Sequence, residues 1–295
     1  MTQAGTLGFI GLGVMGEPMC RNLAKRSGRA VIAHDVRPAP LARLAQDGVG
    51  AARDVPSVAA AAEVVFLSLP DGAAVEAVCG ALLEAGDAPL ALVVDCSTAP
   101  VALARDLHRR FAARGIGFAD APVARTRAAA EAGTLAVMVG ADEKTFAALR
   151  PLLACMASDV LHCGEVGAGQ ATKILNNMVL FETVIALAEA LAIARAAGFD
   201  GARLFEALTQ GSADSFALRN HGRKALLAGD FPERAFSCRY ALKDLGYALD
   251  LAREGGVDAR AAECAQGVLE AAVAEGYGDN YFPVVLKAIE RAPQR

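Results

Sequence analysis

The segment from Leu7 to Gly16 constrains the fold of this chain most strongly, because a short apolar run leads directly into the pattern Gly11-x-Gly13-x-x-Gly16. A helix-like stretch follows the third glycine. In a strand–turn–helix unit of this kind, the first glycine permits the tight turn, the second lets the backbone approach a pyrophosphate, and the third lets helix and strand pack closely. The helix N-terminus adds N–H groups and a partial positive charge. The segment therefore predicts a dinucleotide site.

Asp35 supports the same interpretation, because it ends the second apolar run about twenty residues after the glycines. An acidic side chain at that place accepts hydrogen bonds from the adenosine ribose and repels a 2′-phosphate, so it favours NAD(H) over NADP(H). Arg37, two residues further on, keeps NADP(H) as the alternative. Together with Asp35, the turn residues expected to contact the cofactor are Gly11, Leu12, Gly13, Val14, Met15 and Gly16.

Apolar runs and alanine-rich stretches alternate from residue 7 to about residue 163. This alternation predicts parallel strands joined by helices, with both faces of the sheet covered. The fold class predicted for residues 1–163 is therefore α/β, with a Rossmann-type doubly wound parallel sheet. A minimal nucleotide-binding domain has about six strands. The last two apolar runs, residues 135–140 and 159–164, predict that the sheet continues beyond these strands. The strand-like runs are residues 7–11, 30–35, 63–70, 90–97, 115–123, 135–140 and 159–164.

The character of the sequence changes near residue 164, where a turn-rich junction is followed by stretches with no convincing strand. Residues 169–197 predict one long helix that joins the two parts of the chain. We therefore predict an all-helical second domain over residues 164–295. Its further helical segments are predicted at about 201–211, 216–229, 239–255 and 258–275.

Composition and charge argue against several function classes. The chain has 295 residues and a formal net charge of −4, which gives no electrostatic argument for nucleic acid or an anionic membrane. The long apolar tract carries charged residues, so no membrane span is expected. The seven cysteines and four histidines lack the spacing of a disulfide framework or a metal site, so no metal is expected. Scattered cysteines and the lack of a cationic leader favour a cytoplasmic protein.

Two predicted strands end in residues that could contact a ligand, since ligands of open α/β sheets lie beyond the carboxyl ends of the strands. Leu69 and Pro70 follow one such strand, and they either simply end it or contact the cofactor. Ser97 and Thr98 follow the next one. Their hydroxyls either cap the following helix or hydrogen-bond to a substrate carboxylate or the nicotinamide amide.

A third strand end carries Ala124, Arg125, Thr126 and Arg127 just before a helical stretch. Two arginines at a helix N-terminus are unusual, because cations there oppose the helix dipole. One interpretation is a solvated turn. The other is a site for an anionic substrate, which would use a guanidinium group together with free N–H groups.

The predicted long helix supplies the most reaction-ready group of residues, Lys173-x-x-Asn176-Asn177. Lys173 and Asn177 are four residues apart, so they share one helical face. Polar groups buried in an otherwise apolar helix are costly unless they meet partners or a ligand, although a lone helical lysine is usually just solvated. The pair Lys243–Asp244, by contrast, looks like a surface ion pair that contributes little.

These segments together resemble the β-hydroxyacid dehydrogenase family, which includes 3-hydroxyisobutyrate dehydrogenase and tartronate semialdehyde reductase. The resemblance covers nearly the whole chain. It implies a Rossmann domain, a long connecting helix, and a helical domain that builds a homodimer or homotetramer. The segments that carry it are residues 8–23, 95–98, 120–140, 164–177 and 243–249.

The resemblance also implies roles for individual residues. Lys173 takes the place of the catalytic lysine, the general acid and base of hydride transfer, and Asn177 that of the amide that holds the substrate. Ser97 falls in the substrate-binding motif, and Thr98 lies near the nicotinamide. Lys243 matches a lysine that contacts the cofactor in the family. This role replaces the interpretation of Lys243 as part of a surface ion pair.

The substrate loop departs from the family pattern, which reads DxPVSGG. Here Ala124, Arg125 and Thr126 replace the serine and two glycines. This is similar to the G-R-T loop of the sulfolactaldehyde reductases of the same family, in which arginine meets a sulfonate. We therefore predict an NAD(P)-dependent oxidoreductase that interconverts a small anionic 3-hydroxyacid-type alcohol and its semialdehyde, with a sulfonate favoured.

Three alternatives to this function stay open. Within the same class, the substrate is 3-hydroxyisobutyrate or another carboxylate. An imine reductase shares the fold but usually lacks the lysine. A non-catalytic NAD-binding protein would keep the glycine turn, but it has no need for Lys173 and Asn177 on one helical face.

Overall fold

The computed structural model describes residues 5–86, 88–233 and 235–291. The chain divides into two compact units, Met1–Lys173 and Ile174–Arg295. This division falls inside a helix, ten residues after the boundary predicted between residues 163 and 164, which lies just before the last residue of β9 (Ala157–Gly164).

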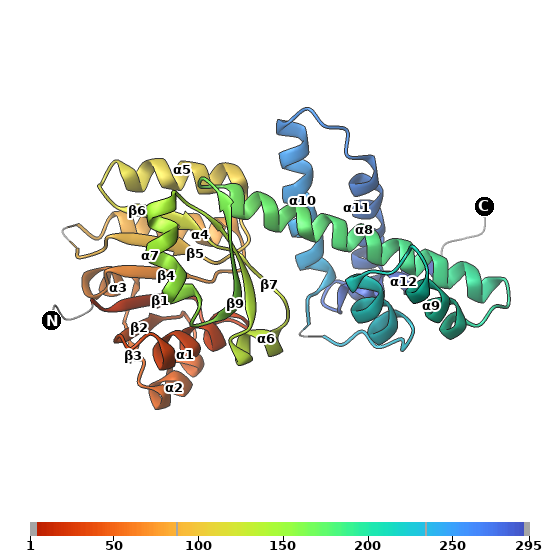
Figure 1. Ribbon diagram of the computed structural model, residues 1–295, viewed down its shortest axis with the longest axis horizontal. Coiled ribbons are helices and arrows are strands. Elements are labelled where there is room, and N and C mark those ends of the chain that lie inside the picture. The colour runs from red at the N-terminus through yellow and green to blue at the C-terminus, as the bar shows by residue number, and fades with distance from the viewer. Residues whose placement is uncertain (1–4, 87, 234, 292–295) are drawn as a thin grey trace. The chain divides into compact units, whose positions relative to one another are not determined.

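The first unit is built on one sheet, in which nine strands are found among the described residues, in the order β3-β2-β1-β4-β5-β6-β8-β7 with β9 paired to β8 (Figure 1). Strands β1 to β6 are parallel, whereas β8 runs antiparallel to both β6 and β7. This arrangement confirms the predicted Rossmann-type α/β fold and its extension past β6. The strands are β1 (Leu7–Ile10), β2 (Val31–His34), β3 (Gly50–Ala51), β4 (Val64–Leu67), β5 (Leu92–Asp95), β6 (Gly117–Asp120), β7 (Val123–Ala124), β8 (Leu135–Gly140) and β9 (Ala157–Gly164).

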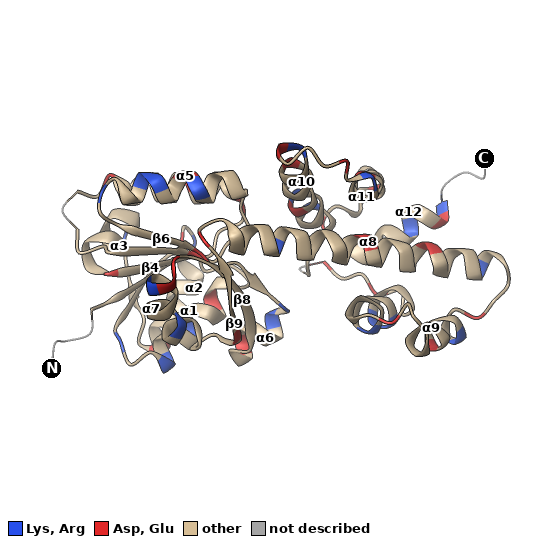
Figure 2. Cartoon of the chain, turned by 45° about the horizontal axis from the view of Figure 1, so that its top comes forward, with Lys and Arg blue, Asp and Glu red and all other residues tan. Residues whose placement is uncertain are grey.

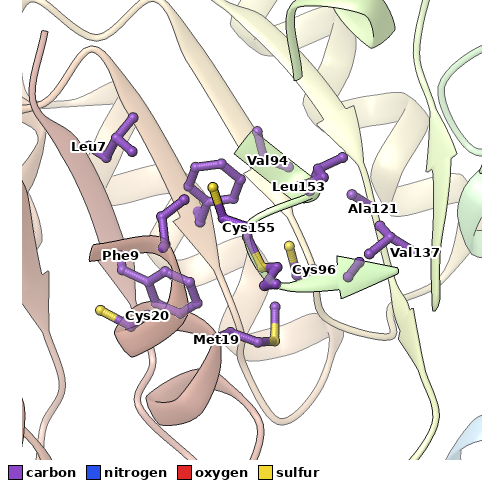
Figure 3. Close-up of a cluster of buried hydrophobic side chains, with 14 of the residues drawn as sticks. Leu7, Phe9, Met19, Cys20, Val94, Cys96, Ala121, Val137, Leu153 and Cys155 are labelled. Atoms are coloured by element: carbon purple, nitrogen blue, oxygen red, sulfur yellow. The ribbon is translucent and has the colours of Figure 1, made fainter. Parts of the chain in front are cut away.

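Helices cover both faces of this sheet because successive strand residues point to opposite sides. Phe9 and Phe66 pack with α1, α6 and α7 in one core (Figure 3), whereas Ile10 and Val65 pack with α3, α4 and α5 in the other. The helices of this unit are α1 (Gly16–Arg26), α2 (Pro38–Leu44), α3 (Val55–Ala61), α4 (Gly72–Leu83), α5 (Val101–Ala112), α6 (Arg127–Ala132) and α7 (Glu143–Leu153), with a 3-10 turn η1 (Ala45–Asp47).

Helix α8 (Ala168–Ala196) runs through the division between the units and carries few charged residues (Figure 2). By length and composition it could cross a membrane. Several of its apolar side chains, including Phe181, Val184 and Leu191, are instead fully buried in the core of the second unit. The core helix of a protein that is not in a membrane can have the same length and composition. The absence of a membrane span therefore stays a prediction.

The second unit is helical, and its described residues show only isolated bridges in place of strands. The predicted helix over 216–229 is a shorter π-helix, η2, and the predicted helix over 258–275 ends early and continues as a second π-helix, η3. Two short helices near the C-terminus were not predicted, because Pro283 interrupts their pattern. The elements after α8 are α9 (Gly201–Gln210), η2 (Leu218–Leu226), α10 (Cys238–Glu254), α11 (Arg260–Ala272), η3 (Val273–Tyr277), η4 (Phe282–Val284) and α12 (Val285–Arg291).

His221 in η2 is a partly buried titratable residue of this unit. Its Nδ1 faces the Tyr281 hydroxyl, and the ring lies against Phe282. Burial, with a smaller contribution from Lys224, lowers the pKa of His221 to about 4. The unfolded chain binds a proton near the ordinary pKa of about 6.5, so it gains stability relative to the fold as the pH drops from about 6.5 to about 4.

We therefore expect the wild-type chain to lose about 3 kcal/mol of unfolding free energy over this pH interval through His221 alone. The variant His221→Gln retains a hydrogen-bonding side chain but does not titrate, so its stability should depend less on pH. Urea unfolding at several pH values measures the difference. Parallel curves for the two proteins would contradict the assignment.

Candidate active site

The glycine turn between β1 and α1 has the geometry that the sequence predicted. Gly11 has a φ of +91°, and a Cβ there or at Gly16 would collide with backbone oxygen, of Ser68 and Gly11 respectively. A Cβ at Gly13 would meet nothing within 4 Å, so the backbone is open at the place where a pyrophosphate would approach. The turn therefore fits a dinucleotide, although the individual contacts stay predictions.

Asp35 is joined to this turn by hydrogen bonds. The Leu12 amide donates to Asp35 Oδ2 at 2.6 Å, and the Arg37 amide and Nε donate to Oδ1 at 2.8 and 3.2 Å. Partial burial would raise the pKa of Asp35, but the hydrogen bonds from Arg37 and Leu12 outweigh it and hold the pKa below its ordinary value. The carboxylate is thus ionised at neutral pH, as a residue that repels a 2′-phosphate must be.

We expect kcat/KM to be at least about tenfold higher with NAD(H) than with NADP(H). Asp35→Asn should narrow this ratio, because it removes the charge but keeps an oxygen for the Leu12 amide. Steady-state kinetics with both cofactors tests this, and Asp54→Asn, which alters the capping residue of α3, serves as the control. A clear preference of the wild type for NADP(H) would refute the assignment of Asp35.

Ser97 joins the ends of β4 and β5. Its Oγ accepts a hydrogen bond from the Leu69 amide at 2.8 Å, and its own amide donates to Asp95 Oδ1 at 2.9 Å. The alternative in which Ser97 or Thr98 caps the next helix is wrong, because α5 begins at Val101 with Pro100 as the preceding residue and has no side-chain cap. Ser97 is only 4% exposed, and its hydroxyl hydrogen can still be donated.

Gln170 and Asp120 are buried and attach the start of α8 to the ends of β5 and β6. Neither was predicted as a site residue. Gln170 Nε2 donates to the Ser97 carbonyl at 2.8 Å, and its Oε1 accepts from the Ala99 amide at 3.1 Å. Asp120, at the end of β6, accepts from the Gly167 and Gln170 amides, both at 2.7 Å. Burial raises the pKa of Asp120, although these amides oppose the shift. The one sequence feature that could have marked Asp120 as a site residue is an acidic side chain at the end of an apolar strand.

Lys173 and Asn177 follow on the same helix, and both are buried, with 9% and 3% of their surfaces exposed. Asn177 Nδ2 donates to Asp244 Oδ2 at 2.8 Å, and Asn177 Oδ1 accepts from Asn176 at 3.2 Å. The amide of Asn177 therefore has one fixed orientation. Asp244 was not predicted as a site residue, and no local pattern marks it.

The Lys243–Asp244 pair is not the surface pair that the residues alone suggested. Asp244 is 2% exposed, and the Lys243 ammonium lies 2.8 Å from its Oδ1. The same ammonium lies over the rings of Tyr247 and Tyr240, 5.0 and 5.7 Å from their centres. Lys243 is thus held in place on α10, and its contact with the cofactor stays a prediction.

Arg125 does not point freely from its loop. Its Nη2 donates to Asp159 Oδ2 at 2.6 Å, and its Nη1 donates to Ser158 Oγ and to the Thr134 carbonyl, both at 2.7 Å. Thr126 caps α6 through a long hydrogen bond from the Ala129 amide at 3.4 Å. The structure thus gives the guanidinium protein partners, and binding of an anion by Arg125 stays a prediction.

Comparisons with known proteins agree with this fold. The family model for the NAD-binding domain of 6-phosphogluconate dehydrogenase matches residues 6–164, and the model described as NAD-binding of NADP-dependent 3-hydroxyisobutyrate dehydrogenase matches residues 167–289. The 2-(hydroxymethyl)glutarate dehydrogenase of Eubacterium barkeri is 36% identical over 294 residues, which cover 99% of this chain and 97% of that protein.

Two mycobacterial proteins complete the comparison. A probable 3-hydroxyisobutyrate dehydrogenase of Mycobacterium tuberculosis is 37% identical over 262 residues, 86% of this chain and 87% of that one. The solved structure of 3-hydroxyisobutyrate dehydrogenase from the same organism with L-serine has a TM-score of 0.89 at 35% identity, covering 98% of this chain and 99% of that chain. Fold and site thus define an NAD(P)-dependent oxidoreductase that acts on hydroxyl groups. The chain belongs to the β-hydroxyacid dehydrogenase family.

Proposed function

We propose that this chain interconverts a small 3-hydroxycarboxylate and its semialdehyde by hydride transfer, with Lys173 as the general acid and base. The observation that carries the proposal is the row formed by Gln170, Lys173 and Asn177 on one face of α8. All three are buried, and Gln170 binds the peptide of Ser97 while Asn177 is held by Asp244. A row of buried polar side chains is costly unless it serves partners or a ligand.

The nicotinamide dinucleotide, when bound, supplies the ring carbon that exchanges the hydride. Lys173 moves the proton: in reduction its Nζ gives a proton to the substrate oxygen, and in oxidation it takes the proton from the hydroxyl. To act as a base it must begin neutral. A positioned acid or base of this type accelerates a reaction by about 10²- to 10⁴-fold.

The remaining residues bind and orient. Ser97 keeps a hydroxyl hydrogen for the substrate carboxylate, because its oxygen accepts from the Leu69 amide. Asn177 presents one fixed face of its amide to the substrate. Thr98 and Lys243 are assigned to the cofactor, and the Asp35 carboxylate to its adenosine ribose.

A carboxylate is the anionic group that the geometry supports best. The positive charge of Arg125 is already matched by Asp159 at 2.6 Å, so the loop that contains Arg125 offers no unmatched guanidinium for a second strong anion. The names of the relatives point the same way, because hydroxymethylglutarate and hydroxyisobutyrate are both hydroxycarboxylates.

A sulfonate substrate is the second candidate, and the specific observation in its favour is the Ala124-Arg125-Thr126 loop itself. For Arg125 to bind a sulfonate, its guanidinium would have to break its hydrogen bond to Asp159 or bind Asp159 and the sulfonate at the same time. This function would be that of a sulfolactaldehyde reductase.

A substrate panel separates the two candidates. NADH consumption is measured with succinate semialdehyde, tartronate semialdehyde and sulfolactaldehyde, and NAD reduction with 3-hydroxyisobutyrate. We expect the highest kcat/KM with a carboxylate. A preference for sulfolactaldehyde of about tenfold or more would favour the sulfonate candidate instead.

We also propose that the chain forms a homodimer or homotetramer in the cytoplasm. Several apolar side chains of α8 are exposed in the single chain, among them Leu175 (42%), Val179 (56%) and Ile193 (68%). Exposed apolar patches of this kind mark association surfaces. Light scattering gives the mass in solution.

A further inference from the structure

Arg125 has an unusual backbone conformation. Its φ is +87°, and among the described residues it is the one non-glycine residue with a positive φ. Such a conformation suits glycine and is unfavourable for a residue with a Cβ. The surrounding contacts must therefore hold Arg125 in place, since the residue itself does not prefer this geometry.

The contacts of the side chain account for this restraint. The guanidinium reaches from the end of β7 to the Thr134 carbonyl before β8 and to Ser158 and Asp159 on β9. The Asp159 carboxylate is oriented in turn, because Ser158 Oγ donates to the same Oδ2 at 2.7 Å. We call Arg125, Ser158 and Asp159 the latch.

An irregularity in β9 builds the receiving half of the latch. Leu135 pairs with Ala157, but the next residue of β8 pairs with Asp159, so Ser158 is the extra residue of a bulge. Successive side chains of a regular strand point to opposite faces, whereas a bulge redirects one of them. Ser158 and Asp159 consequently both meet the same guanidinium.

We infer that Arg125 is a positioning residue that fixes the substrate loop, residues 120–126, to β9, and that it does not itself bind the anionic group of the substrate. This inference rests on the proposed function, because it concerns the same site. Three of the five N–H groups of the guanidinium donate to protein partners, and Asp159 matches its charge. The latch thereby sets the path of the loop that carries Ala124 and Thr126.

Asp159→Asn distinguishes a latch from direct anion binding, because the two roles predict opposite signs. If Arg125 is a latch, losing the carboxylate loosens the loop and raises KM for the substrate by about tenfold or more, with kcat changed much less. If Arg125 binds the anion directly, the same change frees the guanidinium and lowers KM. A lower or unchanged KM overturns the inference.

The ion pair between Arg127 and Glu131 supplies a matched control. Glu131 pairs with Arg127 at 2.8 Å on the exposed face of α6, so Glu131→Gln also removes one carboxylate partner from an arginine. Its kinetic constants should equal those of the wild type. A KM increase as large as that of Asp159→Asn would show a general charge effect and would overturn the latch.

Two further variants separate the latch from a direct contact. Arg125→Lys cannot make three fork-like hydrogen bonds, and adding it to Asp159→Asn should raise KM no further, since both changes open the same latch. Arg125→Gly should raise KM for carboxylate and sulfonate substrates by the same factor. Additive effects, or a loss confined to the sulfonate, would contradict the inference.

Hydrogen exchange separates this inference from the proposed function. If the wild type turns over no member of the substrate panel, the proposed function fails, but the latch can still be measured. Amides of residues 123–134 should exchange about tenfold faster or more in Asp159→Asn than in Glu131→Gln. Equal exchange in the two variants overturns the latch whether or not the chain turns over these substrates.

Discussion

Lys173→Ala is expected to lower kcat by about three orders of magnitude or more while the Kd for NADH changes by less than about twofold. The reason is that the variant loses the proton donor and acceptor, whereas the glycine turn and Asp35 are untouched. Steady-state kinetics gives kcat, and NADH fluorescence gives Kd. Lys144→Ala removes an exposed lysine of α7 and serves as the matched control.

The mechanism also predicts how Lys173→Ala can be partly repaired. The substitution leaves space in a buried setting, so a small primary amine added to the buffer should restore part of the activity by taking over the proton transfer. Wild type and Lys144→Ala should not respond to the amine. Substantial kcat in Lys173→Ala without any amine would remove this lysine from the mechanism.

Asp120→Ala should cause the second largest effect, a loss of about 3 kcal/mol of unfolding free energy together with most of the activity. The fully buried carboxylate accepts from the Gly167 and Gln170 amides, and its removal leaves both donors buried without a partner. Because these amides begin α8, the change also disturbs the placement of Lys173.

Asp142→Ala is the matched control for this stability measurement. Asp142 likewise binds the first turn of a helix, α7, but it is exposed, so water can replace the lost contact. Its removal should cost about 1 kcal/mol. If urea unfolding gives equal losses for the two variants, burial of the Asp120 carboxylate is not what makes it important.

The sequence allowed prediction of features that depend on local pattern. The glycine turn, the alternating sheet and the face shared by Lys173 and Asn177 follow from spacing along the chain. The contacts of Asp120, Asp244 and Arg125 could not be predicted in this way. Three of the partners, Gly167, Asn177 and Asp159, lie 47, 67 and 34 residues away along the sequence, and no periodicity joins such positions.

Two local interpretations failed for reasons of context. Capping of the next helix was one of two interpretations of Ser97, but its hydroxyl accepts a hydrogen bond from Leu69 at the end of the neighbouring strand β4, and α5 begins only at Val101. Lys243 and Asp244 looked exposed because charged neighbours on a helix usually are. In the structure Asp244 faces the buried side of α10, where Asn177 meets it.

The uninterrupted α8 helix has a consequence for how this region can change in evolution. Within a helix of about 3.6 residues per turn, inserting or deleting one residue rotates everything beyond it by about 100°. A single length change between Gln170 and Asn177 would therefore turn the amide away from the lysine even if every side chain were retained. This segment should accept some substitutions but no change of length, whereas the turn at Gly198 can tolerate both.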